Sequence, residues 1–169
     1  MSQTSTNVDI VPQDTANSDE ADRFRLDPYL LDLLWNEPFY STTLRVVSKI
    51  RTRDLPTAGV SGANGSLQLY WNPDFVAGLE TPKIRGLLKH ECWHIILGHI
   101  FDRRREPHLQ WNYACDWAIN SFIPEEELPT CGLYPGRPFE PLTDEQASKM
   151  TPQRLADFET LSAFQAALP

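Results

Sequence analysis

Two histidines and a glutamate, whose types and spacing suit metal chemistry, lie near the middle of the chain. Residues 90–94 read His-Glu-Cys-Trp-His, an H-E-x-x-H pattern. Each residue of a helix turns by about 100°, so His90 and His94 are about 40° apart on one face and can share a metal ion. Glu91 lies about 100° from His90, beside the ion, where a carboxylate can accept a proton from a metal-bound water.

The flanking residues predict a helix from about residue 82 to residue 97. Thr81 is a suitable N-cap, Pro82 suits the first helical position, and Gly98 is a suitable C-terminal stop. Apolar residues recur at helical spacing, namely Ile84, Leu87, Leu88, Ile95 and Leu97. A chain of this size should contain H-E-x-x-H by chance on the order of 1% of the time or less. We therefore interpret the pattern as a metal site rather than as a coincidence in a buried helix.

Two histidines do not complete a zinc site, because catalytic zinc usually has three protein ligands and one open position. His99 is the nearest candidate for a third ligand. On a continued helix His99 would lie about 180° from His90, but a chain turn at Gly98 could bring it back. His108 is a second candidate, in a charged segment broken by a proline.

Asp116 is the third candidate, in a second helix predicted over about residues 109–122. A carboxylate in an otherwise apolar helix needs a partner, because an unpaired buried charge is costly. A short loop could return this helix antiparallel to the first and bring Asp116 to the histidines. The alternative is that Asp116 pairs with an arginine of the 103–105 run, and we favour the metal ligand.

Both helices together resemble a known family. The pattern H-E-x-x-H-x-x-x-G-H, followed by W-N-x-A-x-D-x-x-I-N, resembles the metallopeptidase-type domain at the N-terminus of VWA-like bacterial and phage proteins. The resemblance covers roughly residues 27–122 and includes the Asn72-Pro73 step before the zinc helix. It implies a zincin-like fold, a Zn²⁺ ion held by His90, His94 and Asp116, and Glu91 as the catalytic residue.

The expected fold class is α+β, mostly helical, with a small sheet beside the H-E-x-x-H helix. Residues 1–22 are polar, which predicts a disordered tail. Residues 23–169 are expected to form one domain, with a loop-rich extension over 124–169. An amphipathic helix near the C-terminus, or the tail, could contact an assembly partner.

Further elements are predicted before the H-E-x-x-H helix. Helices are expected over about 27–35 and 39–50, a loop over 55–66, and a helical turn over about 75–79. Alternation predicts a strand over 66–71. In zincins an edge strand pairs with the extended substrate peptide, and this strand is the candidate for that role.

Composition limits the classes of partner. The net charge of −8 argues against binding to nucleic acid or an anionic membrane. The chain has no apolar run long enough for a membrane span and no visible signal peptide, so we expect a cytoplasmic or virion protein. Three cysteines outside any C-x-x-C pair fit a reducing compartment, and Cys92 and Cys115 are expected to be packing residues.

The predicted function is therefore zinc-dependent hydrolysis of a peptide or protein substrate. Zinc would activate a water, and Glu91 would accept its proton and pass it to the leaving amine. The alternative is a non-catalytic zinc centre in an assembly protein, such as a phage structural component.

Overall fold

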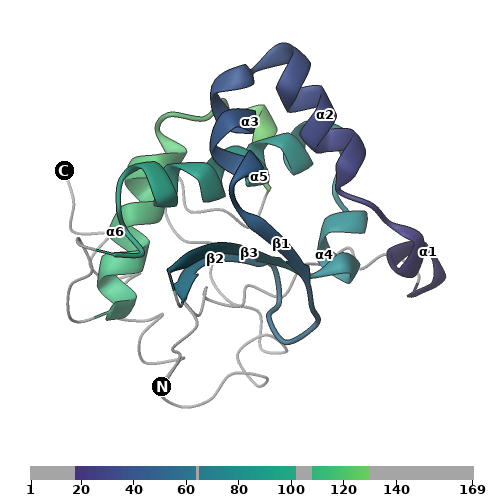
Figure 1. The fold of residues 1–169 in the computed structure, drawn as a ribbon, viewed down its shortest axis with the longest axis horizontal. Coiled ribbons are helices and arrows are strands. Elements are labelled where there is room, and N and C mark those ends of the chain that lie inside the picture. The colour runs from purple at the N-terminus through teal and green to yellow at the C-terminus, as the bar shows by residue number, and fades with distance from the viewer. Residues whose placement is uncertain (1–17, 64, 102–107, 130–169) are drawn as a thin grey trace, which may run out of the picture.

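The computed structural model describes residues 18–63, 65–101 and 108–129, and these residues form an α+β fold, as the sequence predicted (Figure 1). In chain order the elements are α1 (Ser18–Arg23), α2 (Asp27–Asn36), α3 (Pro38–Arg45), β1 (Ser48–Arg51), β2 (Ala58–Ala63), β3 (Ser66–Trp71), α4 (Pro73–Ala77), α5 (Thr81–Ile96), α6 (His108–Asn120) and the short 3₁₀ helix η1 (Glu125–Glu127). The end of the predicted tail, residues 18–22, belongs to α1. None of the helices described is long and apolar enough to cross a membrane.

The three strands form one mixed sheet in the order β1-β3-β2. β3 pairs in parallel with β1, with Gln68 opposite Ser48, and antiparallel with β2, with Trp71 opposite Ala58. The prediction of a strand over 66–71 is confirmed, but its assignment to the edge of the sheet is wrong. Alternation of side chains identifies a strand and its buried face, but it does not say whether that strand has one neighbour or two.

β2 occupies the segment that was expected to be a loop, and it is the edge strand beside α5. Its sequence, Ala-Gly-Val-Ser-Gly-Ala, is rich in small residues that have low strand propensity. The chain turns directly from β2 into β3, and Gly65 has a φ of 74°, in the left-handed region that glycine tolerates. The Asn64-Gly65 dipeptide is a typical two-residue hairpin signal, and it could have revealed the strand.

The helix predicted over 39–50 is shorter than expected. α3 ends at Arg45, and the chain continues into β1 from Ser48. Val46 caps the end of α3, and the chain turns at Val46 and Val47 before β1. Ile50 fits a helical pattern, but its β-branched side chain also favours a strand, and it pairs with Tyr70 of β3.

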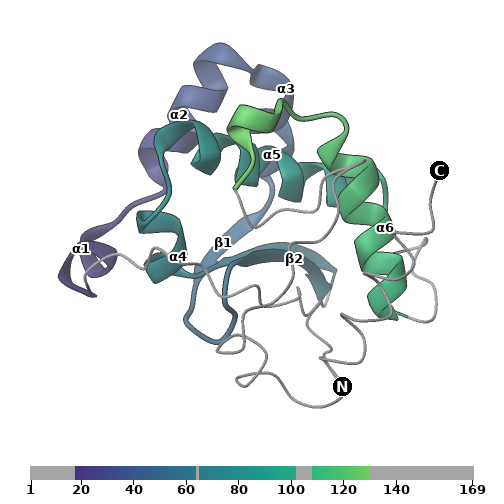
Figure 2. The ribbon, with the colours of Figure 1, turned by 180° about the vertical axis from the view of Figure 1, so that it is seen from behind.

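α5 lies between the sheet and the α2/α3 pair, as both views of the ribbon show (Figures 1 and 2). Ile84, Leu88 and Cys92 follow one another at four-residue spacing and are fully or almost fully buried in the main core. The helix begins one residue earlier than predicted, with Glu80 at the N-cap, and ends just before Gly98, whose φ is 70°. Core packing therefore fixes the rotation of the helix about its axis.

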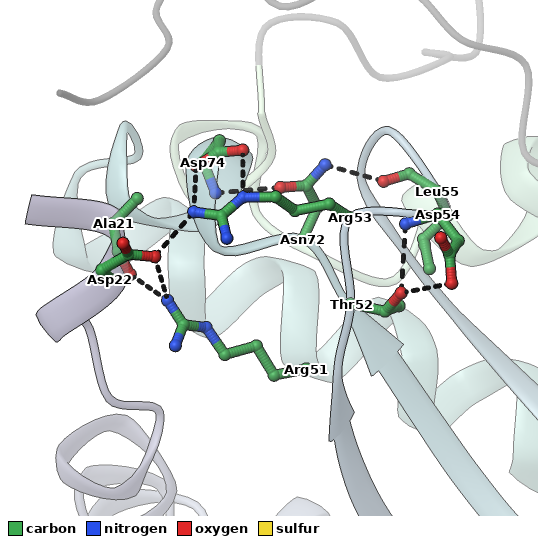
Figure 3. Close-up of polar contacts among 9 residues, drawn as sticks. All are labelled: Ala21, Asp22, Arg51, Thr52, Arg53, Asp54, Leu55, Asn72 and Asp74. Atoms are coloured by element: carbon green, nitrogen blue, oxygen red, sulfur yellow. Dashed lines mark hydrogen bonds and ion pairs between the residues drawn. The ribbon is translucent and has the colours of Figure 1, made fainter. Parts of the chain in front are cut away.

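A polar network anchors the chain at the end of the sheet where β1 and β3 finish (Figure 3). The Asn72 side chain caps α4 by accepting a hydrogen bond from the Asp74 N–H at 2.9 Å, and donates to the Leu55 carbonyl at 2.7 Å. Arg53 binds both Asp22 and Asp74, and these contacts lower the pKa of each carboxyl. The Asn72-Pro73 step thus joins the end of β3 to α4 and to the loop that leads into β2.

A buried lysine of α5, Lys89, forms ion pairs with two other segments of the chain. The ammonium group of Lys89 contacts the carboxylates of Glu37, before α3, and Glu127, in η1. Lys89 is 3% exposed, and an unpaired charge at such a position would be strongly destabilising. η1 follows α6, so these ion pairs hold the chain beyond α6 against α5.

Gly86 permits the close approach of η1 to α5. A Cβ atom at this position would lie 1.8 Å from the Glu127 carbonyl oxygen, which belongs to the backbone. Glycine is unfavourable inside a helix by about 1 kcal/mol relative to alanine, so the contact with η1 explains why glycine suits this buried position.

We predict that Gly86→Ala destabilises the protein despite the higher helix propensity of alanine. The added methyl group must displace η1 and the Lys89–Glu127 pair, and overpacking of this kind costs about 1–3 kcal/mol. Urea unfolding followed by circular dichroism measures the effect. An unchanged or increased free energy of unfolding would show that η1 does not pack on Gly86.

Candidate metal centre

The second predicted helix exists and carries Asp116 to the two histidines. α6 crosses the C-terminal half of α5 at a steep inclination in both views (Figures 1 and 2), so the expected antiparallel arrangement is wrong. Asp116 nevertheless contacts both His90 and His94. A crossing helix meets its partner over a short stretch, and here that stretch contains the H-E-x-x-H residues.

Three potential ligand atoms converge on one point. His94 Nε2 lies 3.0 Å from His90 Nε2 and 3.0 Å from Asp116 Oδ1, and His90 Nε2 lies 3.4 Å from the same oxygen. Among the residues described, these three form a group that could hold a metal ion. Ligand atoms bound tetrahedrally at about 2.0–2.1 Å are about 3.3–3.4 Å apart, close to the observed separations.

The carboxylate oxygen of Asp116 fits a metal ion better than it fits the two histidine nitrogens. Asp116 Oδ1 is buried, and neither nearby histidine nitrogen meets it with hydrogen-bond geometry. A buried carboxylate oxygen normally has a partner, and a cation at the centre of the triangle would supply one. The side chains are 12%, 12% and 20% exposed, so the site lies close to the surface although Asp116 Oδ1 itself is buried.

Electrostatics also favour a cation at this position. Burial alone would raise the pKa of Asp116, but the neighbouring His90 and His94 hold it well below its usual range. Burial opposes a charge on His90 as well, yet the adjacent Asp116 carboxylate outweighs it and raises the pKa of His90 to about 9. The carboxylate thus stays ionised and attracts positive charge into the site.

Glu91 lies next to the three candidate metal ligands and against the edge strand β2. It is 2% exposed, and its carboxylate accepts a hydrogen bond from the Val60 backbone N–H. Burial raises the pKa of Glu91, while the nearby His94 and His90 act in the opposite direction. A raised pKa brings a carboxylate closer to the range in which it can exchange protons near neutral pH. The contact with Val60 was not foreseen, because β2 itself was not predicted.

His99 and His108 are the other two candidates for the third ligand. His99 approaches His94 from outside the triangle, with 3.3 Å between the two Nδ1 atoms, and it does not belong to the three-residue group. The side chain of His108 and the arginines at 103–105 lie outside the part that the structure describes, as do the residues for which an amphipathic C-terminal helix was predicted.

Cys92 and Cys115 are buried free cysteines, and burial raises the pKa of each thiol to about 12. Both are therefore neutral, buried thiols, which fits the expected packing role, and neither belongs to the group that could hold a metal ion.

Comparisons with known proteins identify the family of this chain. Residues 24–150 match the family described as "Putative metallopeptidase domain". An uncharacterized protein of Thermotoga maritima is 29% identical over 99 residues, which are 57% of this chain and 25% of that relative. The matched region thus spans about a quarter of the relative's length. No solved structure matches the chain significantly.

We predict that the purified protein binds about one zinc ion per chain, and that His90→Ala, His94→Ala or Asp116→Ala abolishes tight binding. Asp74→Asn is the matched control, because Asp74 is ion-paired with Arg53 away from the site. Elemental analysis after dialysis against a weak chelator measures the zinc content. Full occupancy in the Asp116 variant would exclude Asp116 as a ligand.

Proposed function

Because the chain belongs to the Putative metallopeptidase domain family, we propose that it is a zinc-dependent peptidase whose metal is held by His90, His94 and Asp116. The main support is the convergence of two imidazole nitrogens and one carboxylate oxygen, which lie 3.0–3.4 Å from one another. Two histidines with one carboxylate form a ligand set that is typical of zinc peptidases.

A zinc ion bound there would act as a Lewis acid, polarising the scissile carbonyl and acidifying a water. Three protein ligands would leave a fourth position for that water, and the partly exposed ligand side chains place the site close to the surface. A fully sealed site with four protein ligands would instead suit a structural ion.

Glu91 is proposed as the general base and acid. Its carboxylate accepts the proton of the attacking water and then delivers that proton to the leaving amine nitrogen. The Val60 N–H orients the carboxylate, and its burial keeps bulk water from competing for the proton.

The substrate is proposed to be an extended peptide that pairs with β2. β2 is an edge strand of the sheet in the described part of the chain, and Val60 at its centre contacts Glu91. A peptide added to this edge would form backbone hydrogen bonds and pass beside the catalytic carboxylate. This role belongs to β2 and not to β3, which has neighbours on both sides.

Glu91→Gln tests the catalytic role. The amide has nearly the same shape, so zinc should remain bound, but it cannot accept the proton, and the rate should fall by about a hundredfold or more. Cleavage of a fluorogenic peptide mixture, with zinc content measured in parallel, gives both values. Glu125→Gln in η1 is a matched exposed control.

Two results would contradict the proposal. Undiminished cleavage by the Glu91 variant would place the chemistry elsewhere. Zinc binding by the wild-type protein without cleavage of any peptide in the mixture would favour the alternative, a metal centre in an assembly protein.

A further inference from the structure

Each histidine of the proposed metal site has its second ring nitrogen engaged by a side chain outside the ligand set. Asn120 Oδ1 lies 2.8 Å from His90 Nδ1. His99 Nδ1 lies 3.3 Å from His94 Nδ1. The Nε2 atoms of both rings face Asp116 instead. Each ring is therefore contacted at both nitrogens, with Nε2 facing the proposed metal position and Nδ1 facing away from it.

The contact with Asn120 selects one tautomer of His90. A neutral imidazole has one N–H group and one lone pair, and only the lone pair can bind a metal. An amide oxygen accepts hydrogen bonds, so it stabilises the tautomer with the proton on Nδ1 and the lone pair on Nε2. Asn120 is 6% exposed, so bulk water does not readily replace this acceptor.

The contact with His99 selects the corresponding tautomer of His94. If His94 Nε2 binds a metal, its Nδ1 must carry the proton, and His99 Nδ1 must then be the acceptor. The turn at Gly98 brings His99 back so that its backbone N–H donates to the His94 carbonyl at 3.0 Å. Its ring packs edge-to-face against Trp111 of α6, with 5.8 Å between ring centroids. His99 is thus fixed on the far side of His94 from the metal.

We propose that Asn120 and His99 are positioning residues that fix the tautomers of His90 and His94 and thereby set the metal affinity. The proposal rests on the metal site of the proposed function, but it assigns roles to two residues outside that site. Partners of metal-bound histidines typically contribute 10–100-fold to affinity. α6 carries the ligand Asp116, the hydrogen-bonding partner Asn120, and Trp111, which packs against His99. Docking of this one helix therefore supplies both the third ligand and the contacts that hold the two histidines.

The test compares variants that remove the acceptor with variants that keep it. Asn120→Leu and His99→Leu remove the acceptor, whereas Asn120→Asp and His99→Gln retain an oxygen that can accept from Nδ1–H. Cobalt(II) is the probe, because its visible spectrum reports the coordination geometry. Its affinity is measured by chelator competition, and the melting temperature of each metal-free protein reports the fold. Asn36→Leu, at the exposed end of α2, is the control for the substitution itself.

The expected result is about 10–100-fold weaker cobalt binding for both leucine variants, with one ion still bound per chain and a similar spectrum. Asn120→Asp and His99→Gln should recover most of the affinity. The control should bind as the wild type does. A general loss of structure would lower the melting temperature of the metal-free protein and would not be reversed by the acceptor-keeping variants.

Several results would overturn the proposal. Affinities within about threefold of the wild type in both leucine variants would remove the positioning role. A loss in His99→Leu as complete as that in Asp116→Ala, with an altered spectrum, would make His99 a ligand. Wild-type protein that binds no cobalt would refute both the positioning role and the metal site. Metal binding that responds as expected, in a protein that cleaves no peptide, would refute only the peptidase function.

Discussion

A carboxylate buried among helices must be compensated by positive charge, and the placement of Asp116 follows from this requirement. Its Oδ1 atom lies within 3.0–3.4 Å of two imidazole nitrogens and lacks a hydrogen bond of normal geometry. α6 can dock on α5 only where this compensation is available, because the desolvation cost of a lone charge is several kcal/mol or more. The surrounding packing supports the same docking, since Lys89 and Gly86 hold η1, just beyond α6, against α5.

The parts of the site that sequence reasoning could predict are those set by local spacing. Residues four apart on a helix share a face, so His90 and His94 were predicted to act together, and the structure places their Nε2 atoms 3.0 Å apart. Asp116 was predicted because an acidic residue in an apolar helix needs a partner. Asn120 stood one turn further along the same face, but spacing alone did not indicate that it would contact His90. The α+β class followed from the same periodicities.

The parts that sequence reasoning missed depend on pairing, contacts and backbone angles that the spacing of apolar residues does not reveal. β2 consists of small residues with little strand propensity, and it is a strand because β3 supplies its hydrogen-bonding partner. The contact of Val60 with Glu91 follows from that pairing and has no local signal. α3 is shorter than predicted, because the apolar pattern through Val46, Val47 and Ile50 fits a helix, whereas the chain turns at Val46 and Ile50 pairs with β3. The side from which His99 reaches His94 depends on a single glycine dihedral, so sequence could not choose between ligand and neighbour.

We propose that one metal ion joins α5 to α6 through His90, His94 and Asp116. Anomalous scattering at the zinc absorption edge, measured on crystals of the protein grown with zinc, would locate this ion. We expect one strong anomalous peak about 2 Å from the Nε2 atoms of both histidines and from Asp116 Oδ1, with His99 outside the coordination sphere. A peak coordinated by His99 in place of Asp116, or no peak between the two helices, would contradict it.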